Sequence, residues 1–320
     1  MTWKDEYREL MFPVNRSEVK LEEARKIKFE NIPTSLFKYR PVSDFSFDNL
    51  INDTVRVTKA SEFNDPYDCA LQVSHEKVID ERLKIAFLKE IPQIFKKHNV
   101  NYEQEEIDNV RYQSYKDLLT FAYSKASKQE PEKVEGFVTQ VYENSMGIHE
   151  EFTRSVISDF QEGTCISCFS EEVNSILMWS HYAYNHKGFC IEYNFTQCDK
   201  SDALTRDLYP ANYTNELFDI ADFLIQKNNV NKLFTTYSAI TKSDEWNYEK
   251  EWRLVLTYGK GKAESFNLEV VKPTAIYLGA KISEENRKTV INIAKSKGLR
   301  VFQMKMSSNA FKLFYDEVSI

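Results

Sequence analysis

The stretch Trp246–Leu256, WNYEKEWRLVL, sets two glutamates and an arginine into a run with the composition of a strand. Side chains of a strand alternate between its two faces. If the extended backbone reaches back to Glu249, then Glu249, Glu251 and Arg253 share one face. The other face is then mainly apolar and carries Lys250, Trp252, Leu254 and Leu256. We therefore predict a strand with one buried face and a charged opposite face.

The charged face has two interpretations. In the first, the strand lies at the surface and Arg253 pairs with Glu249 or Glu251, an arrangement that contributes little to stability. In the second, a rigid strand holds two carboxylates close together, where they raise one another's proton affinity or stabilise a developing positive charge. The residues of this stretch leave both interpretations open.

Strand and helix patterns alternate irregularly along the chain. Strand patterns occur at 36–40, 54–60, 164–170, 188–195, 252–258, 274–282, 300–306 and 311–318. Helical patterns occur at 46–53, 172–188 (closed by Gly188), 216–229, 230–243 and 283–298. This mixed order favours an α+β fold with a mixed, mainly antiparallel sheet over a doubly wound parallel sheet.

Two segments lie outside this pattern. Residues 1–35 are charged and compatible with helix, and we expect an N-terminal helical extension. Residues 76–160 are almost free of glycine and proline and have helical spacing, as in 81–98 and 115–126. We predict a single α+β domain over 36–320, with 76–160 as an all-helical insertion and a candidate surface for a protein partner.

Composition narrows the class of protein. The 320 residues carry a net charge of −7, which disfavours non-specific nucleic-acid binding, although a local basic groove stays compatible with it. Five cysteines do not make a disulfide framework, and the N-terminal residues lack the pattern of a signal peptide. No apolar run is long enough to span a membrane. We expect a cytoplasmic protein without membrane attachment.

Polar residues beside the first strands are candidates for ligand binding. In LFKYR, Lys38 and Arg40 face away from Phe37 and Tyr39. The following FNDPYD carries Asn64, Asp65 and Asp68 around a proline, which is typical of an Asx-type turn. The alternative is that this turn presents its polar side chains to a site.

Metal ligation has little support in the sequence. Cys165 and Cys168 have the spacing of a metal knuckle, but a second pair is missing, and buried strand cysteines explain them. On a helix, His181 and His186 would lie about 140° apart and so would not share a face. Each would instead share a face with a polar neighbour, His181 with Asn185 and His186 with Tyr182. With Trp179, these residues indicate either a packed amphipathic helix or a ligand-binding wall.

The motifs KYR, FNDPYD, FS, MWSHYAYNHKGFCIEY, WNYEKEWR and IYLG occur in this order. Together they resemble a bacterial family known as a domain of unknown function, from about Leu36 to near the C-terminus. This resemblance implies no activity.

A second resemblance does imply one. ADP-ribosyltransferase-type enzymes place an arginine on the first core strand, a serine on the second, and Glu-x-Glu before a later strand. Arg40, then Ser167 or Ser170, then Glu249 and Glu251 occur here in that order. The resemblance implies NAD as substrate, Arg40 on its phosphate, Ser170 positioning the ribose or the glutamate, and Glu251 as the catalytic carboxylate with Glu249 assisting.

Three functions follow as hypotheses. The first is an enzyme that transfers ADP-ribose or hydrolyses NAD, in bacterial defence or stress. The second is a non-catalytic nucleotide or ligand sensor, and the third a metal-dependent hydrolase or nuclease using Asp65, Asp68, His181 and Glu251. The first hypothesis requires no metal. Its predicted catalytic residues are Glu251, Glu249 and Ser170. Its predicted ligand-binding residues are Lys38, Tyr39, Arg40, Asn64, Asp65, Asp68, Trp179, His181, Tyr182, His186 and Arg253. It requires Arg40 and the glutamates to meet in one hollow.

Overall fold

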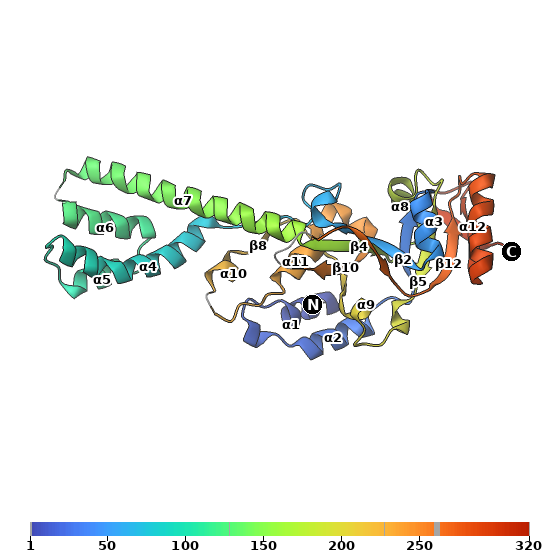
Figure 1. The fold of residues 1–320 in the computed structure, drawn as a ribbon, viewed down its shortest axis with the longest axis horizontal. Helices are drawn as coiled ribbons and strands as arrows, with labels where there is room; N and C mark the ends of the chain where they lie inside the picture. The colour runs from blue at the N-terminus through green and yellow to red at the C-terminus, as the bar shows by residue number, and fades with distance from the viewer. Residues whose placement is uncertain (1, 128, 227, 259–262, 320) are drawn as a thin grey trace.

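The computed structural model describes residues 2–127, 129–226, 228–258 and 263–319. Over these residues the molecule is elongated, with a body built on a sheet and an arm of helices that projects from it (Figure 1).

The body is organised by a ten-stranded sheet within the described residues. Its strands are β1 Leu36–Arg40, β2 Thr54–Lys59, β4 Thr164–Ser170, β5 Phe189–Tyr193, β6 Leu208–Pro210, β10 Glu251–Thr257, β11 Phe266–Glu269, β12 Pro273–Leu278, β13 Arg300–Met306 and β14 Leu313–Glu317. The main path runs β11-β2-β4-β1-β5-β12-β13-β14, and β10 joins β4 to β6. Neighbours are antiparallel except β12 and β13, which are parallel and are connected through helix α12, Glu284–Lys297. The predicted α+β fold with a mainly antiparallel sheet is confirmed.

Helices cover both faces of this sheet, whose strands β1, β4 and β5 bury side chains on both sides. One apolar cluster joins Leu36 and Ile191 of the sheet to Leu50 of α3, Asp44–Ile51, and to Val290 of α12. A second cluster lies around α8, Ile176–Tyr182, where Trp179 packs with residues of β1 and β12. The sheet is therefore a central layer.

The N-terminal helices pack on the part of the sheet near β10. They are α1, Trp3–Met11, and α2, Leu21–Glu30, joined through the short helix η1, Arg16–Glu18. The Trp3 ring stacks on Trp252 with 6.1 Å between ring centroids. The strand predicted from WRLVL is thus buried under another part of the chain.

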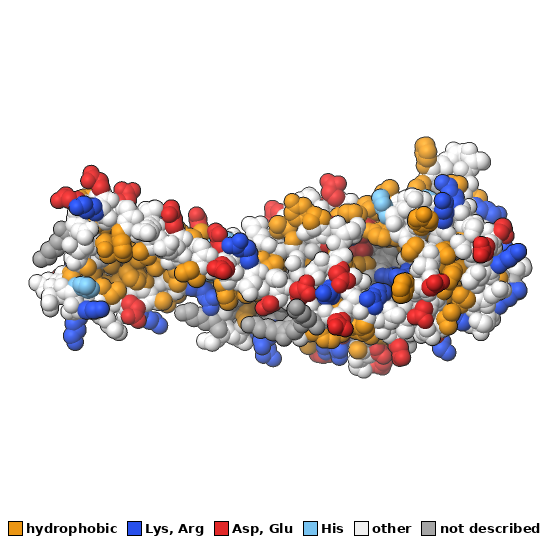
Figure 2. Space-filling view, turned by 45° about the horizontal axis from the view of Figure 1, so that its top comes forward, with side chains coloured by type: hydrophobic (Ala, Val, Ile, Leu, Met, Phe, Trp, Pro, Cys, Tyr) orange, Lys and Arg blue, Asp and Glu red, His pale blue; other side chains and the backbone are white. Residues whose placement is uncertain are grey.

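Four helices form the arm, which occupies the stretch predicted to be all-helical (Figure 1). They are α4 His75–Lys97, α5 Gln104–Val110, α6 Tyr115–Ser127 and α7 Pro131–Glu162. The arm has its own apolar clusters, around Ile79 and Val134 and around Phe95 and Leu118. Figure 2 shows hydrophobic side chains gathered on one face of it. At 1.5 Å per residue, α7 is about 48 Å long and leads directly into β4.

Smaller elements complete the body. They are η2 Ala60–Glu62, β3 Leu71–Gln72, η3 Phe195–Gln197, α9 Ala203–Arg206, β7 Asn212–Thr214, β8 Phe218–Asp219, α10 Ala221–Ile225, α11 Phe234–Ile240, β9 Thr241–Ser243 and η4 Asp244–Glu249. Two predicted helices are wrong in extent. The stretch 216–229 forms β8, paired with β3, before the short α10, and Lys227 lies outside the described residues. The stretch 230–243 is helical only in α11, because its end pairs with β7 as β9.

The predicted helix 172–188 is also wrong in extent. It ends at Tyr182, and the next turn holds Tyr184, Asn185 and His186 at φ values of 48°, 55° and 67°. A helix cannot continue through three residues in the left-handed region. Side chains at 181 and 185, or at 182 and 186, therefore do not share a helical face. Gly188 serves close approach instead of capping, because a Cβ there would lie 2.1 Å from the Arg40 carbonyl oxygen.

Strand β10 begins at Glu251, so the extended backbone does not reach back to Glu249. Glu249 ends the 3-10 helix η4, and Lys250 between them is left-handed, with φ of 45°. The face opposite Trp252 is buried as well, since Arg253 is 0% exposed. The interpretation of this stretch as a surface strand is therefore wrong.

Candidate functional site

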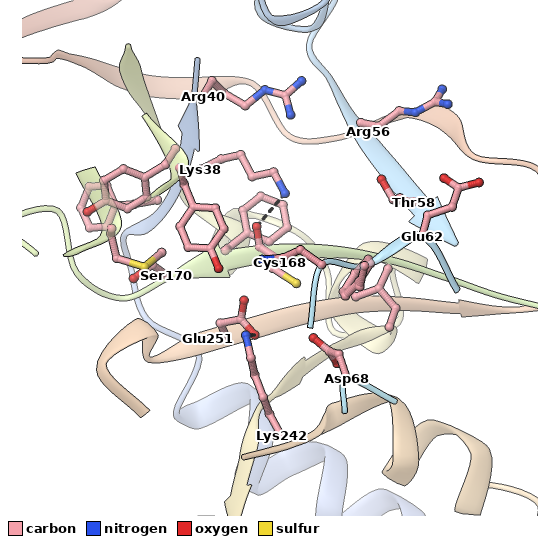
Figure 3. A pocket seen from close by; sticks show the side chains of 18 residues that line it. Lys38, Arg40, Arg56, Thr58, Glu62, Asp68, Cys168, Ser170, Lys242 and Glu251 are labelled. Carbon is pink, nitrogen blue, oxygen red and sulfur yellow. Dashed lines mark hydrogen bonds and ion pairs between the residues drawn. The ribbon is translucent and has the colours of Figure 1, made fainter. Parts of the chain in front are cut away.

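A gap in the sheet creates the site. Strand β4 pairs with β10 along its whole length. On its other side, β4 pairs with β1 only at Ser170 and with β2 only at Ile166 and Cys165. Residues 167–169 therefore have no strand on that side in the described chain. A cavity of about 330 Å³ opens there, which is within the size range of small-molecule sites (Figure 3).

The cavity brings together many of the residues predicted for a site. Those that line it are Lys38, Tyr39, Arg40, Asn64, Asp68, Ser170, Tyr182 and Glu251. Glu249 and Arg253 do not line it but contact Lys242 and Glu251, which do. Asp65, Trp179, His181 and His186 lie outside the lining. Arg40 and Glu251, far apart in the sequence, thus meet in one hollow.

Lys38 replaces part of the missing strand. Its Nζ donates to the carbonyl oxygen of Cys168 at 2.8 Å and to Ser167 Oγ at 2.9 Å. The Cys168 carbonyl lies on the part of β4 that has no strand beside it, so the ammonium satisfies an acceptor that would otherwise lack a partner. Burial lowers the pKa of Lys38 to about 8. The side chain is a cation held by neutral acceptors.

Arg40 and Arg56 extend the positive charge across the gap. Arg40 ends β1, and its Nη2 donates to Asn49 Oδ1 at 2.5 Å. Arg56 stands on β2, and Figure 3 shows both guanidinium groups on the same side of the cavity. Burial, and to a lesser extent the charge of Arg56, lower the pKa of Arg40. We call Lys38, Arg40 and Arg56 the cationic wall.

Within the described residues, the charges of the cationic wall have no carboxylate in ion-pair contact. Among the described residues, none of the three cations lies within 4.0 Å of an Asp or Glu oxygen. Positive groups that line a cavity without counter-charges favour the binding of an anion, and arginine suits phosphate in particular.

The opposite side of the cavity is built on Arg253. Its Nη1 and Nη2 donate to the two carboxylate oxygens of Asp68 at 2.6 and 2.8 Å, and its Nε donates to Glu251 Oε2 at 2.9 Å. The carbonyl of Ala239 accepts a further bond from Nη1 at 2.8 Å. A fully buried guanidinium is thus surrounded by acceptors, as such a group requires.

Lys242 links the two glutamates. Its Nζ lies 2.5 Å from Glu249 Oε2 and 3.5 Å from Glu251 Oε2. Glu249 Oε1 accepts from the Tyr182 hydroxyl at 2.6 Å. We call Asp68, Lys242, Glu249, Glu251 and Arg253 the buried charge cluster; it holds three acids and two bases.

The two glutamates differ in pKa. Burial alone would raise the pKa of Glu251, but the charges of Arg253 and Lys242 more than offset it and hold that pKa below its ordinary value. Burial and the neighbouring charge of Glu251 raise the pKa of Glu249 to about 7, against the opposite effect of Lys242. Glu251, which lines the cavity, is therefore the ionised carboxylate, and Glu249 behind it is the one that titrates near neutrality.

Part of the chain matches a known family model. Residues 178–254 match the family model described as Protein of unknown function (DUF2971). The resemblance to a family of unknown function is thereby confirmed over these residues, which are part of the range predicted from about Leu36 to near the C-terminus. The match includes most of α8, all of β5 and the segment from Lys242 to Leu254, whereas β1, β2 and β4 lie before it. No curated protein and no solved structure matches the chain.

Ser170 anchors the end of the DUF2971 segment to β4. Its Oγ donates to the carbonyl oxygen of Glu249 at 2.6 Å and accepts from the backbone N–H of Glu172 at 3.1 Å. Ser170 is paired in register with Glu251. Ser167 instead accepts from Lys38. Of the two serines, Ser170 is the one that positions the glutamates.

The polar residues of the turn FNDPYD, residues 63–68, have different positions relative to the cavity. Asp65 Oδ1 accepts from the Tyr67 N–H at 2.9 Å, the contact of an Asx-type turn, and does not line the cavity. Asn64 is exposed at the cavity margin, and Asp68 is tied to Arg253. The turn thus delivers Asn64 and Asp68 to the site.

Fewer residues of α8 and the turn after it line the cavity than were predicted for the site. Trp179 is buried and donates to the Val173 carbonyl at 2.7 Å, and His186 stacks on it with centroids 6.4 Å apart. His181 is exposed and outside the lining. Tyr182 reaches the cavity from this helix, together with Met178.

The structure adds residues that the sequence analysis missed, chiefly Arg56 and Lys242. The alternation of TVRVTK marks Arg56 as opposite to the buried Val55 and Val57, which was a usable signal. Lys242 carries no local signal, because only the fold brings it to the glutamates. In the described part of the chain, no group of three or more His, Cys, Asp or Glu residues could hold a metal ion, and no helix is long and apolar enough to cross a membrane.

Proposed function

We propose that the protein is an enzyme that acts on a nucleotide such as NAD, by transfer or hydrolysis at the bond between nicotinamide and ribose. The observation that carries this proposal is the polarity of one cavity. Its cationic wall forms no ion pair with a carboxylate in the part of the chain that the structure describes, and an ionised carboxylate, Glu251, lies on the opposite side (Figure 3). NAD offers the matching groups, phosphates and a ribose carbon that becomes positive as the bond breaks.

Glu251 is suited to the reacting centre. Cleavage of a bond between a base and a ribose passes through an oxocarbenium-like transition state, which a fixed carboxylate stabilises. Arg253 and Lys242 hold Glu251 in one orientation and keep it ionised. Because these contacts fix the carboxylate, it needs no rearrangement during the reaction.

The arrangement of strands supports the ADP-ribosyltransferase-like form of this proposal. Arg40, Ser170 and Glu251 stand on β1, β4 and β10, and β4 pairs with both of the others. In this form Arg40 holds a phosphate, Ser170 fixes the segment that carries the glutamates, and Glu251 faces the ribose. The five cysteines are free, which suits a cytoplasmic enzyme.

The test measures nicotinamide release from NAD by the pure protein and by Glu251→Gln. We expect release by the wild type and a decrease of about 10²- to 10³-fold in the variant, the effect of removing one charge-stabilising group. Glu317→Gln, on an exposed ion pair, is the matched control and should keep full activity. Absence of release, and of any modified protein or nucleic acid in a cell lysate, would overturn the enzymatic proposal.

A second candidate is a nucleotide sensor without turnover, whether in phage defence or in another stress response. It is favoured by the two cations that already contact Glu251, because a carboxylate with two partners is also stable as a purely structural group. A thermal-shift titration with NAD and ADP distinguishes the two functions. Stabilisation that follows ligand concentration with no product formed supports the sensor, and no shift with either nucleotide argues against it.

A further inference from the structure

The two arginines of the cationic wall belong to strands that do not pair with each other directly, because β4 lies between them. Arg40 ends β1 and Arg56 lies on β2, while β1 and β2 each pair with β4 at opposite ends of the gap. Figure 3 shows both side chains on one side of the cavity, with the Arg40 guanidinium directed toward β2 and the Arg56 guanidinium directed away from Arg40. Their charges act on one another, since Arg56 lowers the pKa of Arg40. Two like charges are therefore held near each other over a cavity.

Arg40 is fixed in this position by a short chain of polar contacts. Asn49 of α3 is 3% exposed; its Oδ1 accepts from Arg40 Nη2, and its Nδ2 donates to Thr54 Oγ1 at 2.9 Å. Thr54 begins β2, the strand that carries Arg56. The Arg40 guanidinium is thus oriented from the strand across the gap, by a buried amide that adds no negative charge.

The carboxylate nearest to this margin is engaged elsewhere. Glu62 also lines the cavity, but its Oε1 pairs with Lys59 at 3.6 Å and its Oε2 accepts from Ser265 Oγ at 2.8 Å. Glu62 therefore forms its ion pair with Lys59 and none with Arg56. A positive charge on each margin of one gap, with Arg40 held by Asn49, matches two linked negative charges better than a single one.

We propose that Arg40 and Arg56 clamp two linked phosphates, so that this site prefers nucleoside diphosphates and their esters to nucleoside monophosphates. The inference rests on the nucleotide site proposed above and names its substrate class. In it, Arg40 and Lys38 bind the phosphate nearer the reacting ribose, and Arg56 binds the second phosphate. Arg56 is then the specificity-determining residue, because a monophosphate leaves it without a partner.

Calorimetric titration with ADP and AMP tests this clamp on the wild type, Arg56→Ala and Arg300→Ala. We expect the wild type to bind ADP at least about 10-fold more tightly than AMP, the contribution of one charge-assisted phosphate contact. Arg56→Ala should lose most of this preference because its affinity for ADP decreases, whereas its affinity for AMP should change less than about twofold. Arg300→Ala removes an exposed arginine on another strand and should behave as the wild type.

Several outcomes overturn the clamp. They are equal affinity of the wild type for ADP and AMP, equal weakening of both ligands by Arg56→Ala, and binding of neither nucleotide. Nicotinamide release from NAD, measured beside the titrations, separates the two proposals. Nicotinamide release without a preference for ADP supports the enzymatic proposal and contradicts the clamp. A preference for ADP without release supports the clamp in a protein that acts as a nucleotide sensor. Arg56→Lys adds a second variant, which should retain part of the preference because it keeps the charge without the bidentate geometry.

Discussion

The two charged sides of the cavity differ in how their charges are balanced. In the buried charge cluster, every charged side chain contacts an opposite charge, as when Arg253 meets Asp68 and Glu251. In the cationic wall, Lys38 and Arg40 contact neutral oxygens. The first arrangement stabilises the folded chain without help from a ligand. The second favours the binding of an anion, and this difference is the physical basis for the proposal that phosphates bind at the wall.

The largest expected effect comes from breaking the balanced side. Arg253→Leu would leave Asp68 and Glu251 buried without their guanidinium partner. We expect a loss of about 3–5 kcal/mol in the free energy of unfolding, because an uncompensated buried charge is strongly destabilising. Chemical denaturation followed by circular dichroism measures the loss.

Arg300→Leu is the control for this variant, because Arg300 pairs with Glu317 at the surface. It should change stability by less than about 1 kcal/mol. Similar losses for the two variants would show that the cluster stabilises no more than an exposed ion pair, and the comparison of the two sides would lose its physical basis.

A smaller effect concerns the excess acid in the cluster. Three carboxylates face two cations, and the pKa of Glu249 is raised to about 7 by burial and Glu251. The folded state therefore binds a proton that the unfolded state releases at lower pH. The stability that protonated Glu249 contributes is complete below the ordinary pKa of glutamate and is lost as pH rises through about 7.

Glu249→Gln should remove this loss. Relative to the wild type, the variant should gain about 2 kcal/mol between pH 5 and pH 8, since it stays neutral throughout. Denaturation curves of both proteins at the two pH values measure the change. Glu317→Gln, whose carboxyl has a lowered pKa, should show no such relative gain. A variant whose stability runs parallel to that of the wild type would contradict the raised pKa of Glu249.

Local patterns predicted those parts of the site that depend on one strand. Alternation placed Lys38 and Arg40 opposite Phe37 and Tyr39, and the same rule placed Trp252 and Leu254 in the core. Alternation needs only extended backbone, so it can be read from adjacent residues. The α+β class followed in the same way from the order of such segments.

The rest depended on contacts between distant segments. The left-handed Lys250 separates Glu249 from the strand, and Lys242 draws both glutamates together again. Neither is visible in WNYEKEWR alone. The end of α8 at Tyr182 is likewise followed by three left-handed residues and by the close packing of Gly188 on the Arg40 carbonyl, which a helical pattern cannot reveal.

The smallest expected change in stability concerns the unbalanced side. Arg56 is exposed and has no carboxylate partner among the described residues, so Arg56→Ala removes repulsion from Arg40 and little else. We expect the free energy of unfolding to stay within about 0.5 kcal/mol of the wild-type value, or to rise slightly at low salt, where like charges repel most. Denaturation at low and high ionic strength measures this. A loss above about 1 kcal/mol would show that Arg56 is a structural residue, and its charge could then no longer be assigned to a ligand.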